Sequence, residues 1–302
     1  MDALVADVQG GGLSPRELVA RAGGVREAFL GAYFPPDLLQ PLRAKVEAVF
    51  PGVAKLKVRS SANAEDIPGF DGAGLHDSYS VKTKVRDEPC QQCRVEVEVE
   101  EDGEVNHKVD PRSLACAVRA VYASLWNRRA IDERWFARID QTTVAMGLAL
   151  VAAYDTESEV VANAVVITRV LNTDAVYGYS LSLQSGNNLV TNPTPGTHSE
   201  VTIAAFISDE EPISFTTTRF AKPDADAPAL TSPVLSAEAM TALVDLVRTV
   251  ERAYCAAEPD YYPGDCGSVT SDNTKPRSLD LEVKVLANGQ FVIKQVREFG
   301  GR

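Results

Sequence analysis

The chain has 302 residues, of which 45% are hydrophobic and 24% charged, a composition that is typical of a globular protein and excludes a disordered chain. Its net charge of −12 would repel a phosphate backbone, so nucleic acid is not expected as a general partner. No run reaches the roughly 18 apolar residues of a membrane-spanning helix, and residues 1–24 do not follow the basic and then apolar pattern of a signal peptide, so we expect a cytoplasmic protein without a membrane partner.

The N-terminal segment, residues 1–54, is predicted to be helical. Ser14 is a good capping residue, Pro15 suits the first helical position, and apolar residues then recur at helical spacing. The chain breaks at Pro35, and a second amphipathic helix follows and ends at Pro51.

A strand and a loop of small residues come next. Apolar and charged residues alternate over 55–59, as in a half-buried strand, and Arg59 leaves its end on the polar face. The loop that begins at Ser60 lets the backbone approach a ligand, and Arg59 offers a planar charged group for phosphate. The other interpretation, which the pattern alone favours, is a solvated turn in which Arg59 pairs with Glu65 or Asp66.

An insert at about 85–110 contains an acidic hairpin. Valines alternate with glutamates over 94–100, and a return strand runs through 105–109. The glutamate face could be a docking or lid element, although the pattern favours a solvated surface.

The cysteines do not form the pattern of a secreted disulfide framework. There are five, an odd number, so we expect reduced thiols. Cys90 and Cys93 have a spacing seen in zinc sites, but such a site needs about four ligands, and the remaining cysteines and His107 form no second close pair. A plain pair of loop thiols is favoured, with no role assigned.

A long helix is predicted from Asp110 through Trp135, where apolar residues recur at spacings of 3, 4 and 7. The apolar, β-branched runs 144–153 and 160–168 follow, and we expect them to pair as antiparallel strands of a buried sheet. Arg169 stands just beyond the second run.

Residues 177–190 are predicted to form a further strand pair or a strand and loop. Proline-rich connections at 192–196 and 223–233 follow. Ser236 then caps a helix whose apolar stripe ends near Pro259, which identifies it as a packing helix.

The last predicted element is a hairpin of strands 279–286 and 290–299 with a turn at Asn288 and Gly289. A two-residue turn pairs Val285 with Val292, Val283 with Lys294, Glu282 with Gln295, and Asp280 with Arg297. The predicted core face then contains Leu281, Val283, Val285, Val292 and Val296. The polar face gathers Asp280, Glu282, Gln295 and Arg297 at its far end.

The polar end of this hairpin is a candidate metal site. The carboxylate of Glu282 and the carboxamide oxygen of Gln295 are hard ligands of the kind that Mg²⁺ prefers, and Arg297 could hold a phosphate. The other interpretation, which the pattern alone favours, is a solvated polar ladder with an ion pair between Asp280 and Arg297.

Several stretches resemble the nucleotide-binding domain of the phosphoenolpyruvate synthase and pyruvate phosphate dikinase family, an ATP-grasp fold. They are residues 58–62 with 64–66, 121–130 with 138–140, and 280–282 with 295–297. The resemblance covers about 55–299. It implies an α+β fold in which antiparallel sheets and packed helices form two lobes around a nucleotide cleft, with 55–302 as the nucleotide-binding domain.

The resemblance also implies site residues. Glu282 and Gln295 would bind Mg²⁺, while Arg59 and Arg297 would be catalytic and hold the phosphates of ATP, with Ser60 beside Arg59. It suggests that Arg169 lies near the same phosphates; the alternative is an exposed arginine at a strand end.

At Asn187 the sequence departs from the family, which has a Gln-Gly-Glu in this region. Asparagine can accept a hydrogen bond from a ribose hydroxyl but brings no charge for a metal. Family members have a Gly-Gly-Lys segment whose lysine reaches the ATP phosphates, and residues 1–54 contain no such segment. The family's phosphohistidine motif is not matched either, since His198 fits an ordinary loop histidine.

Two functions are therefore predicted. The first is an ATP-binding phosphotransferase domain, with Mg²⁺-dependent transfer toward a histidine on a separate phosphohistidine domain or protein. The alternative is a degenerate, non-catalytic nucleotide-binding or interaction module of the same fold.

Overall fold

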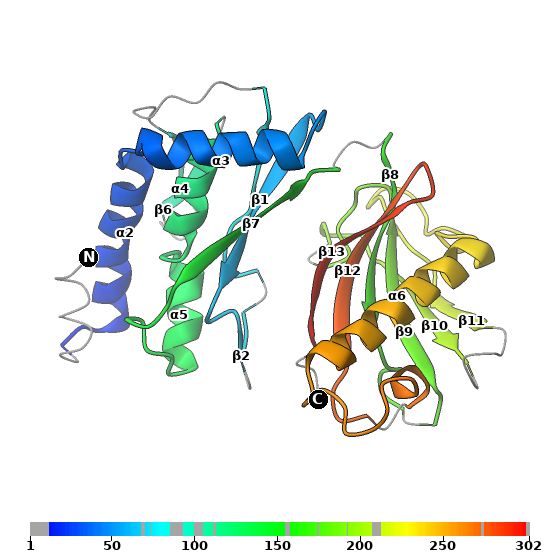
Figure 1. Ribbon diagram of the computed structural model, residues 1–302. Helices are drawn as coiled ribbons and strands as arrows, with labels where there is room; N and C mark the ends of the chain where they lie inside the picture. The colour runs from blue at the N-terminus through cyan, green and yellow to red at the C-terminus, as the bar shows by residue number, and fades with distance from the viewer. Residues whose placement is uncertain are drawn as a thin grey trace. The chain divides into compact units, whose positions relative to one another are not determined.

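The computed structural model describes residues 12–67, 70–72, 74–84, 93–99, 105–110, 113–154, 158–173, 175–191, 193–206, 213–272 and 275–299. The chain forms two compact units, Met1–Ala153 and Tyr154–Arg302, and each is considered by itself (Figure 1). The division into 1–54 and 55–302 is a different one and stays a prediction. In the described ranges no helix combines the length and apolar character needed to cross a membrane.

Four helices are described in the first unit: α2 (Pro15–Gly31), α3 (Pro36–Val49), α4 (Leu114–Ser124) and α5 (Arg128–Phe136). Helix α2 begins as predicted. The Ser14 hydroxyl accepts from the backbone N–H of Glu17, and the Glu17 carboxylate accepts from the Ser14 N–H at 2.9 Å, which satisfies two backbone donors at the helix start.

The single long helix predicted from Asp110 to Trp135 is wrong, because the chain forms α4 and α5 instead. Leu125 and Trp126 donate backbone hydrogen bonds to carbonyls three residues back, which tightens and ends α4. Asn127 is then extended and occupies the N-cap position of α5, without a capping hydrogen bond from its side chain.

The sheet of the first unit has the antiparallel order β4-β1-β7, formed by β4 (Tyr79–Lys82), β1 (Lys55–Ala62) and β7 (Met146–Ala152). Leu56 and Val58 are buried on the face that packs against α2 and α4. Strand β1 is longer than predicted, because it pairs with β7 as far as Ala62, so Ser60 lies in a strand and not in a loop.

Two short ladders complete the described first unit: β2 (Asp66–Ile67) with β3 (Phe70–Asp71), and β5 (Arg94–Val99) with β6 (Val105–Asp110). The second ladder confirms the predicted acidic hairpin.

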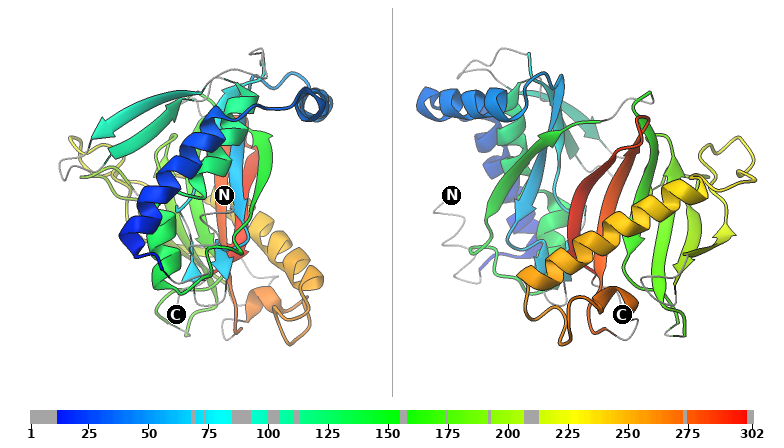
Figure 2. Two further views of the ribbon diagram at one scale, coloured as in Figure 1. Left: turned by 90° about the vertical axis from the view of Figure 1, so that its left-hand side faces the viewer. Right: turned by 45° about the vertical axis from the view of Figure 1, so that its right-hand side comes forward.

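The second unit is built on a six-stranded antiparallel sheet in the order β11-β10-β9-β8-β12-β13. The strands are β8 (Val160–Ile167), β9 (Gly178–Ser185), β10 (Glu200–Ala205), β11 (Ser214–Arg219), β12 (Leu279–Leu286) and β13 (Phe291–Glu298). Helix α6 (Ala237–Ala257), capped by Ser236 as predicted, crosses one face of this sheet (Figure 2), and a short 3-10 helix, η1 (Val269–Ser271), follows. The apolar stripe of α6 packs on alternate residues of the strands. Helices combined with antiparallel sheets confirm the α+β class.

The predicted pairing of the runs 144–153 and 160–168 is wrong. Strand β7 pairs with β1 in the first unit, while β8 lies between β9 and β12 in the second. Apolar periodicity shows that a strand is buried but does not identify its neighbour. The prediction paired the two runs because only residues 154–159 separate them, and a short connection does not require that two strands pair.

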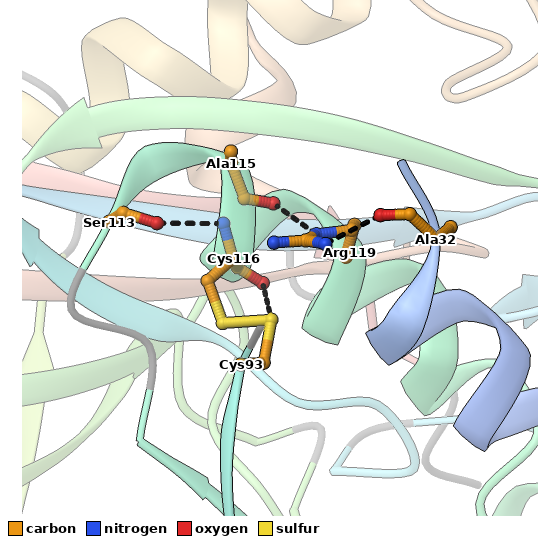
Figure 3. Close-up of a disulfide and its surroundings, with 6 residues drawn as sticks. All are labelled: Ala32, Cys93, Ser113, Ala115, Cys116 and Arg119. Atoms are coloured by element: carbon orange, nitrogen blue, oxygen red, sulfur yellow. Dashed lines mark hydrogen bonds between the residues drawn. A yellow bond between two sulfur atoms is a disulfide. The ribbon is translucent and has the colours of Figure 1, made fainter. Parts of the chain in front are cut away.

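Two disulfides link four of the five cysteines, so the expectation of reduced thiols is wrong for these four. Cys93 is bonded to Cys116 in the first unit (Figure 3), and Cys255 to Cys266 in the second, with Cα atoms 5.5 and 5.8 Å apart. The fold brings together residues that are 23 and 11 positions apart, which cysteine spacing alone does not show.

The first disulfide ties the acidic hairpin to a helix. Cys93 precedes β5, and Cys116 lies in the first turn of α4, where its N–H donates to the capping hydroxyl of Ser113 at 3.2 Å (Figure 3). Cys90 lies outside the described residues. Within the described part of the chain, no group of three or more His, Cys, Asp or Glu side chains could hold a metal.

Candidate functional site

The face of the six-stranded sheet opposite α6 carries a row of charged side chains on β12. Alternation places the apolar residues of this strand in the core and leaves Asp280, Glu282 and Lys284 on the other face. Asp280 is nearly buried, and the other two are half-buried. This charged row is the centre of the candidate site.

The pairing of β12 with β13 follows the predicted register only at its far end. There Asp280 lies opposite Arg297 and Glu282 opposite Gln295, as predicted. Nearer the turn Val283 pairs with Ile293, so the register shifts by one residue. The shift makes Lys294 the extra residue of a β-bulge.

The turn sets the pairing of the residues near it, and the bulge restores the predicted pairing beyond Lys294. The Leu286 N–H donates to the Gln290 carbonyl at 2.8 Å, so the connection holds three residues, and Gly289 adopts a φ of 82° that suits glycine. Val292 therefore pairs with Lys284 on the polar face, and Phe291 packs against the core instead. The prediction that Val292 belongs to the core face is wrong.

Two ion pairs organise the far end of the hairpin. Arg297 donates through Nε and Nη2 to Asp280 Oδ2 at 3.1 and 2.9 Å, and the two side chains are 18% and 11% exposed. Lys294 Nζ lies 2.6 Å from Glu282 Oε2, and both side chains are about one quarter exposed. The ion pair that the sequence pattern favoured is present, and the charges of Lys284, Lys294 and Arg297 outnumber the two carboxylates.

The turn after β9 reaches the same row. Lys284 Nζ donates to Asn187 Oδ1 at 2.8 Å and to the Tyr154 carbonyl. Asn163 on β8 donates to the carbonyls of Gly186 and Asn188 at 3.2 and 3.0 Å, which holds the turn against the sheet. The structure thus brings Asn187 to the charged row, although it lies 97 residues from Lys284 in sequence.

Two valines of β8 lie beside the charges, on either side of Asn163, and are called the apolar strip. Val165 on β8 is the cross-strand partner of Glu282, and Val161 on the same face is 44% exposed. Arg169 lies two residues beyond Ile167, which pairs with Asp280, so it follows the same end of the sheet. Its charge is one of the influences that lower the pKa of Lys275, for which burial is the main cause.

Arg59 belongs to a cationic face of the sheet in the first unit. Leu56 and Val58 face the core, so Arg59 lies on the opposite face of β1 together with Lys55 and Lys57. Lys82 on β4 pairs with Lys55, and the partner of Arg59 on β7 is the small residue Ala149.

Ser60 alternates with Arg59 and so lies on the side of Val58, whereas the exposed Ser61 shares the face of Arg59. Gly147 on β7 lies opposite Ser61, and a Cβ at Gly147 would be 3.2 Å from the Ser61 carbonyl oxygen. The cationic face thus has the small residues Ala149 and Gly147 as its neighbours on β7.

One comparison with known proteins decides the family. The family model for the AMP/ATP-binding domain of pyruvate phosphate dikinase matches residues 4–259. The chain belongs to this family. The match includes the described first unit, strands β8 to β11 and helix α6, and it ends before the β12–β13 hairpin.

The chain thus carries a pyruvate phosphate dikinase type AMP/ATP-binding domain, and its second unit offers three cations, Lys284, Lys294 and Arg297, beside an apolar strip. A nucleotide needs both features, because its phosphates are anionic and its base is largely apolar. Strand alternation could have identified Lys284 from sequence, since it continues the series of Asp280 and Glu282. No local signal identifies Lys294, because a bulge depends on how two strands meet.

The β12–β13 hairpin contains oxygen donors that can be compared with the ligands that Mg²⁺ prefers. The carboxylate of Glu282 and the carboxamide of Gln295 are cross-strand partners, and hard oxygen donors of this kind suit the ion. One carboxylate oxygen of Glu282 already accepts from Lys294. The donor types therefore fit the ion, and the Lys294 ammonium shares the same carboxylate.

Proposed function

We propose that this domain binds ATP with Mg²⁺ and acts in phosphoryl transfer toward a histidine on a separate domain or protein. The observation that carries the proposal is the meeting of Glu282, Gln295 and Arg297 at one end of the β12–β13 hairpin. Membership of a family of AMP/ATP-binding domains supports the binding of ATP.

In this proposal Glu282 and Gln295 would hold Mg²⁺, which when bound would neutralise charge on the phosphates. Arg297 would donate N–H groups at the edge of its planar guanidinium to a phosphate, while Asp280 fixes its orientation through the two hydrogen bonds. Arg169 would contribute a further positive charge at this end of the second unit.

In the first unit, Arg59 would bind phosphate oxygens on the cationic face of β1. Ser60 would contribute through its backbone, because its side chain lies on the opposite side of the strand. Lys57 lies on the Arg59 side and would strengthen the attraction for an anion.

A non-catalytic nucleotide-binding or interaction module is the second candidate. Asn187 supports it, because a carboxamide here accepts from Lys284 and offers no carboxylate for a metal. Such a module would bind nucleotide and leave the phosphate chain intact.

Calorimetric titration with ATP and Mg²⁺ tests the site. Arg297→Gln should weaken ATP binding roughly 10- to 100-fold, because a charge-assisted contact to a phosphate is lost. Arg277→Gln is the matched control, since Arg277 also pairs with a carboxylate of this hairpin, Glu298, at 3.1 Å, but is 45% exposed. If the two variants bind ATP with equal affinity, Arg297 is not part of the nucleotide site.

Arg59→Gln should also weaken binding, and Arg128→Gln, which removes an exposed arginine of α5, should not. Release or transfer of a labelled terminal phosphate then separates the two candidates. Binding without phosphate release or transfer favours the non-catalytic module, and absence of ATP binding rejects both.

A further inference from the structure

The β-bulge in β13 changes the chemistry of the proposed metal site. In a regular hairpin Lys294 would face Val283 and point to the core. The bulge instead brings its ammonium to the polar face, 2.6 Å from Glu282 Oε2. The next residue, Gln295, is the cross-strand partner of the same glutamate. The Glu282 carboxylate is therefore the ion-pair partner of Lys294 and, together with Gln295, a proposed ligand of the metal.

We propose that Lys294 is a built-in counter-ion of Glu282 that competes with free divalent metal and moves to a phosphate when the nucleotide arrives. The inference rests on the proposed function, since it names a specificity residue of the same site. It predicts a domain that binds free metal weakly and accepts metal mainly together with nucleotide.

The geometry supports a displaceable cation. The Lys294 and Glu282 side chains are 25% and 26% exposed, so solvent and ligand reach the pair. A lysine ammonium is a compact charge on a flexible stem, and it can leave one oxygen for another without moving the backbone. The adjacent Arg297 differs, because two hydrogen bonds and lower exposure hold its planar guanidinium on Asp280.

Charge balance gives the reason for the competition. While the ammonium lies on Glu282, an arriving divalent ion meets a neutralised carboxylate and a nearby positive charge. When a nucleotide brings its phosphates, these become the more strongly charged partners for the ammonium, and Glu282 is released to the metal. The two events are therefore coupled through a single side chain.

Binding of Mn²⁺ to the nucleotide-free protein, followed by electron paramagnetic resonance, tests the inference without any activity measurement. Lys294→Met keeps the length of the stem and removes the charge, so Mn²⁺ affinity should rise about fivefold or more, the size of a partly exposed charge pair. Arg277→Met is the control. It also removes one positive charge from an ion pair of this hairpin, and it should leave Mn²⁺ affinity unchanged.

The gain must also depend on Glu282. In a Glu282→Gln background, Lys294→Met should no longer raise Mn²⁺ affinity. In a second measurement, ATP binding in the presence of a metal chelator should weaken about fivefold in Lys294→Met, because the phosphates lose the ammonium.

An Mn²⁺ affinity that is the same in wild type and Lys294→Met, or too weak to measure in both, would overturn the inference. A gain that persists without Glu282 would also overturn it. Failure of the proposed function is a separate result, in which the wild type binds no ATP with or without metal while the Mn²⁺ comparison still reports on Lys294.

Discussion

Replacing Lys275 by Met should destabilise the second unit strongly, because it removes one half of a buried ion pair. Lys275 Nζ lies 2.8 Å from Glu251 Oε1, and the two side chains are 2% and 0% exposed. The hydroxyls of Tyr179 and Tyr261 donate to the same carboxylate at 2.7 and 2.9 Å. The network joins α6 to β9 and to the segment that leads into β12.

The size of the effect follows from burial. Without Lys275, the Glu251 carboxylate keeps its two tyrosine donors but loses its counter-ion in a site that water does not reach. Breaking one side of a buried pair costs about 3–5 kcal/mol of unfolding free energy. Removing one side of the exposed pair between Arg277 and Glu298 should cost about 1 kcal/mol or less.

Hydrogen exchange followed by mass spectrometry is the suitable assay, because it reports each unit separately. Amides of α6 and β9 should lose protection in Lys275→Met, while those of α4 in the first unit should not change. Arg277→Met serves as the control. The double variant Lys275→Met with Glu251→Gln should recover part of the loss, because no buried charge then remains. A loss of protection in Lys275→Met no larger than in Arg277→Met would refute the reasoning.

Two further predictions concern covalent links and pH. Peptide mapping without reductant should recover both disulfides. Cys266→Ser should lower the unfolding free energy of the second unit by about 3 kcal/mol, because the Cys255–Cys266 bond restricts the unfolded chain. An unchanged denaturation midpoint would contradict this prediction. Burial lowers the pKa of His76, whose Nδ1 lies 3.3 Å from the Ser124 carbonyl oxygen, so the folded state favours the neutral ring. Its stabilisation should be complete above about pH 6.5 and decrease as pH falls, since the unfolded chain then binds the extra proton. Denaturation of wild type and His76→Gln between pH 7.5 and 5.5 measures this, and a constant difference in unfolding free energy would exclude it.

The local elements were accessible from sequence because their signals are local. Ser14 and Ser236 mark helix starts through hydrogen bonds that reach only three residues, and the apolar stripe of α6 follows helical spacing. The alternation of β12 likewise identified Asp280 and Glu282 as members of one face.

Elements without a strong local signal were less accessible. Strands β10 and β11 were not predicted, although Val201, Ile203 and Ala205 alternate with Thr202 and Ala204 in β10. Strand β10 pairs with β9, and β11 pairs with β10 at one edge of the sheet; no local pattern indicates these partners.

Sequence by itself determined the helix starts and the existence of the last hairpin, for which residue type and short-range periodicity are sufficient, and the resemblance to a known family indicated the α+β class. The predicted pairing of Glu282 with Gln295 holds in the structure because the bulge reverses the one-residue shift that the three-residue turn introduces. Tertiary structure alone decided that β7 joins β1, that four cysteines form two disulfides, and that a bulge brings Lys294 to Glu282. Each of these depends on which distant segments meet when apolar faces are buried, and that information is spread over the whole chain.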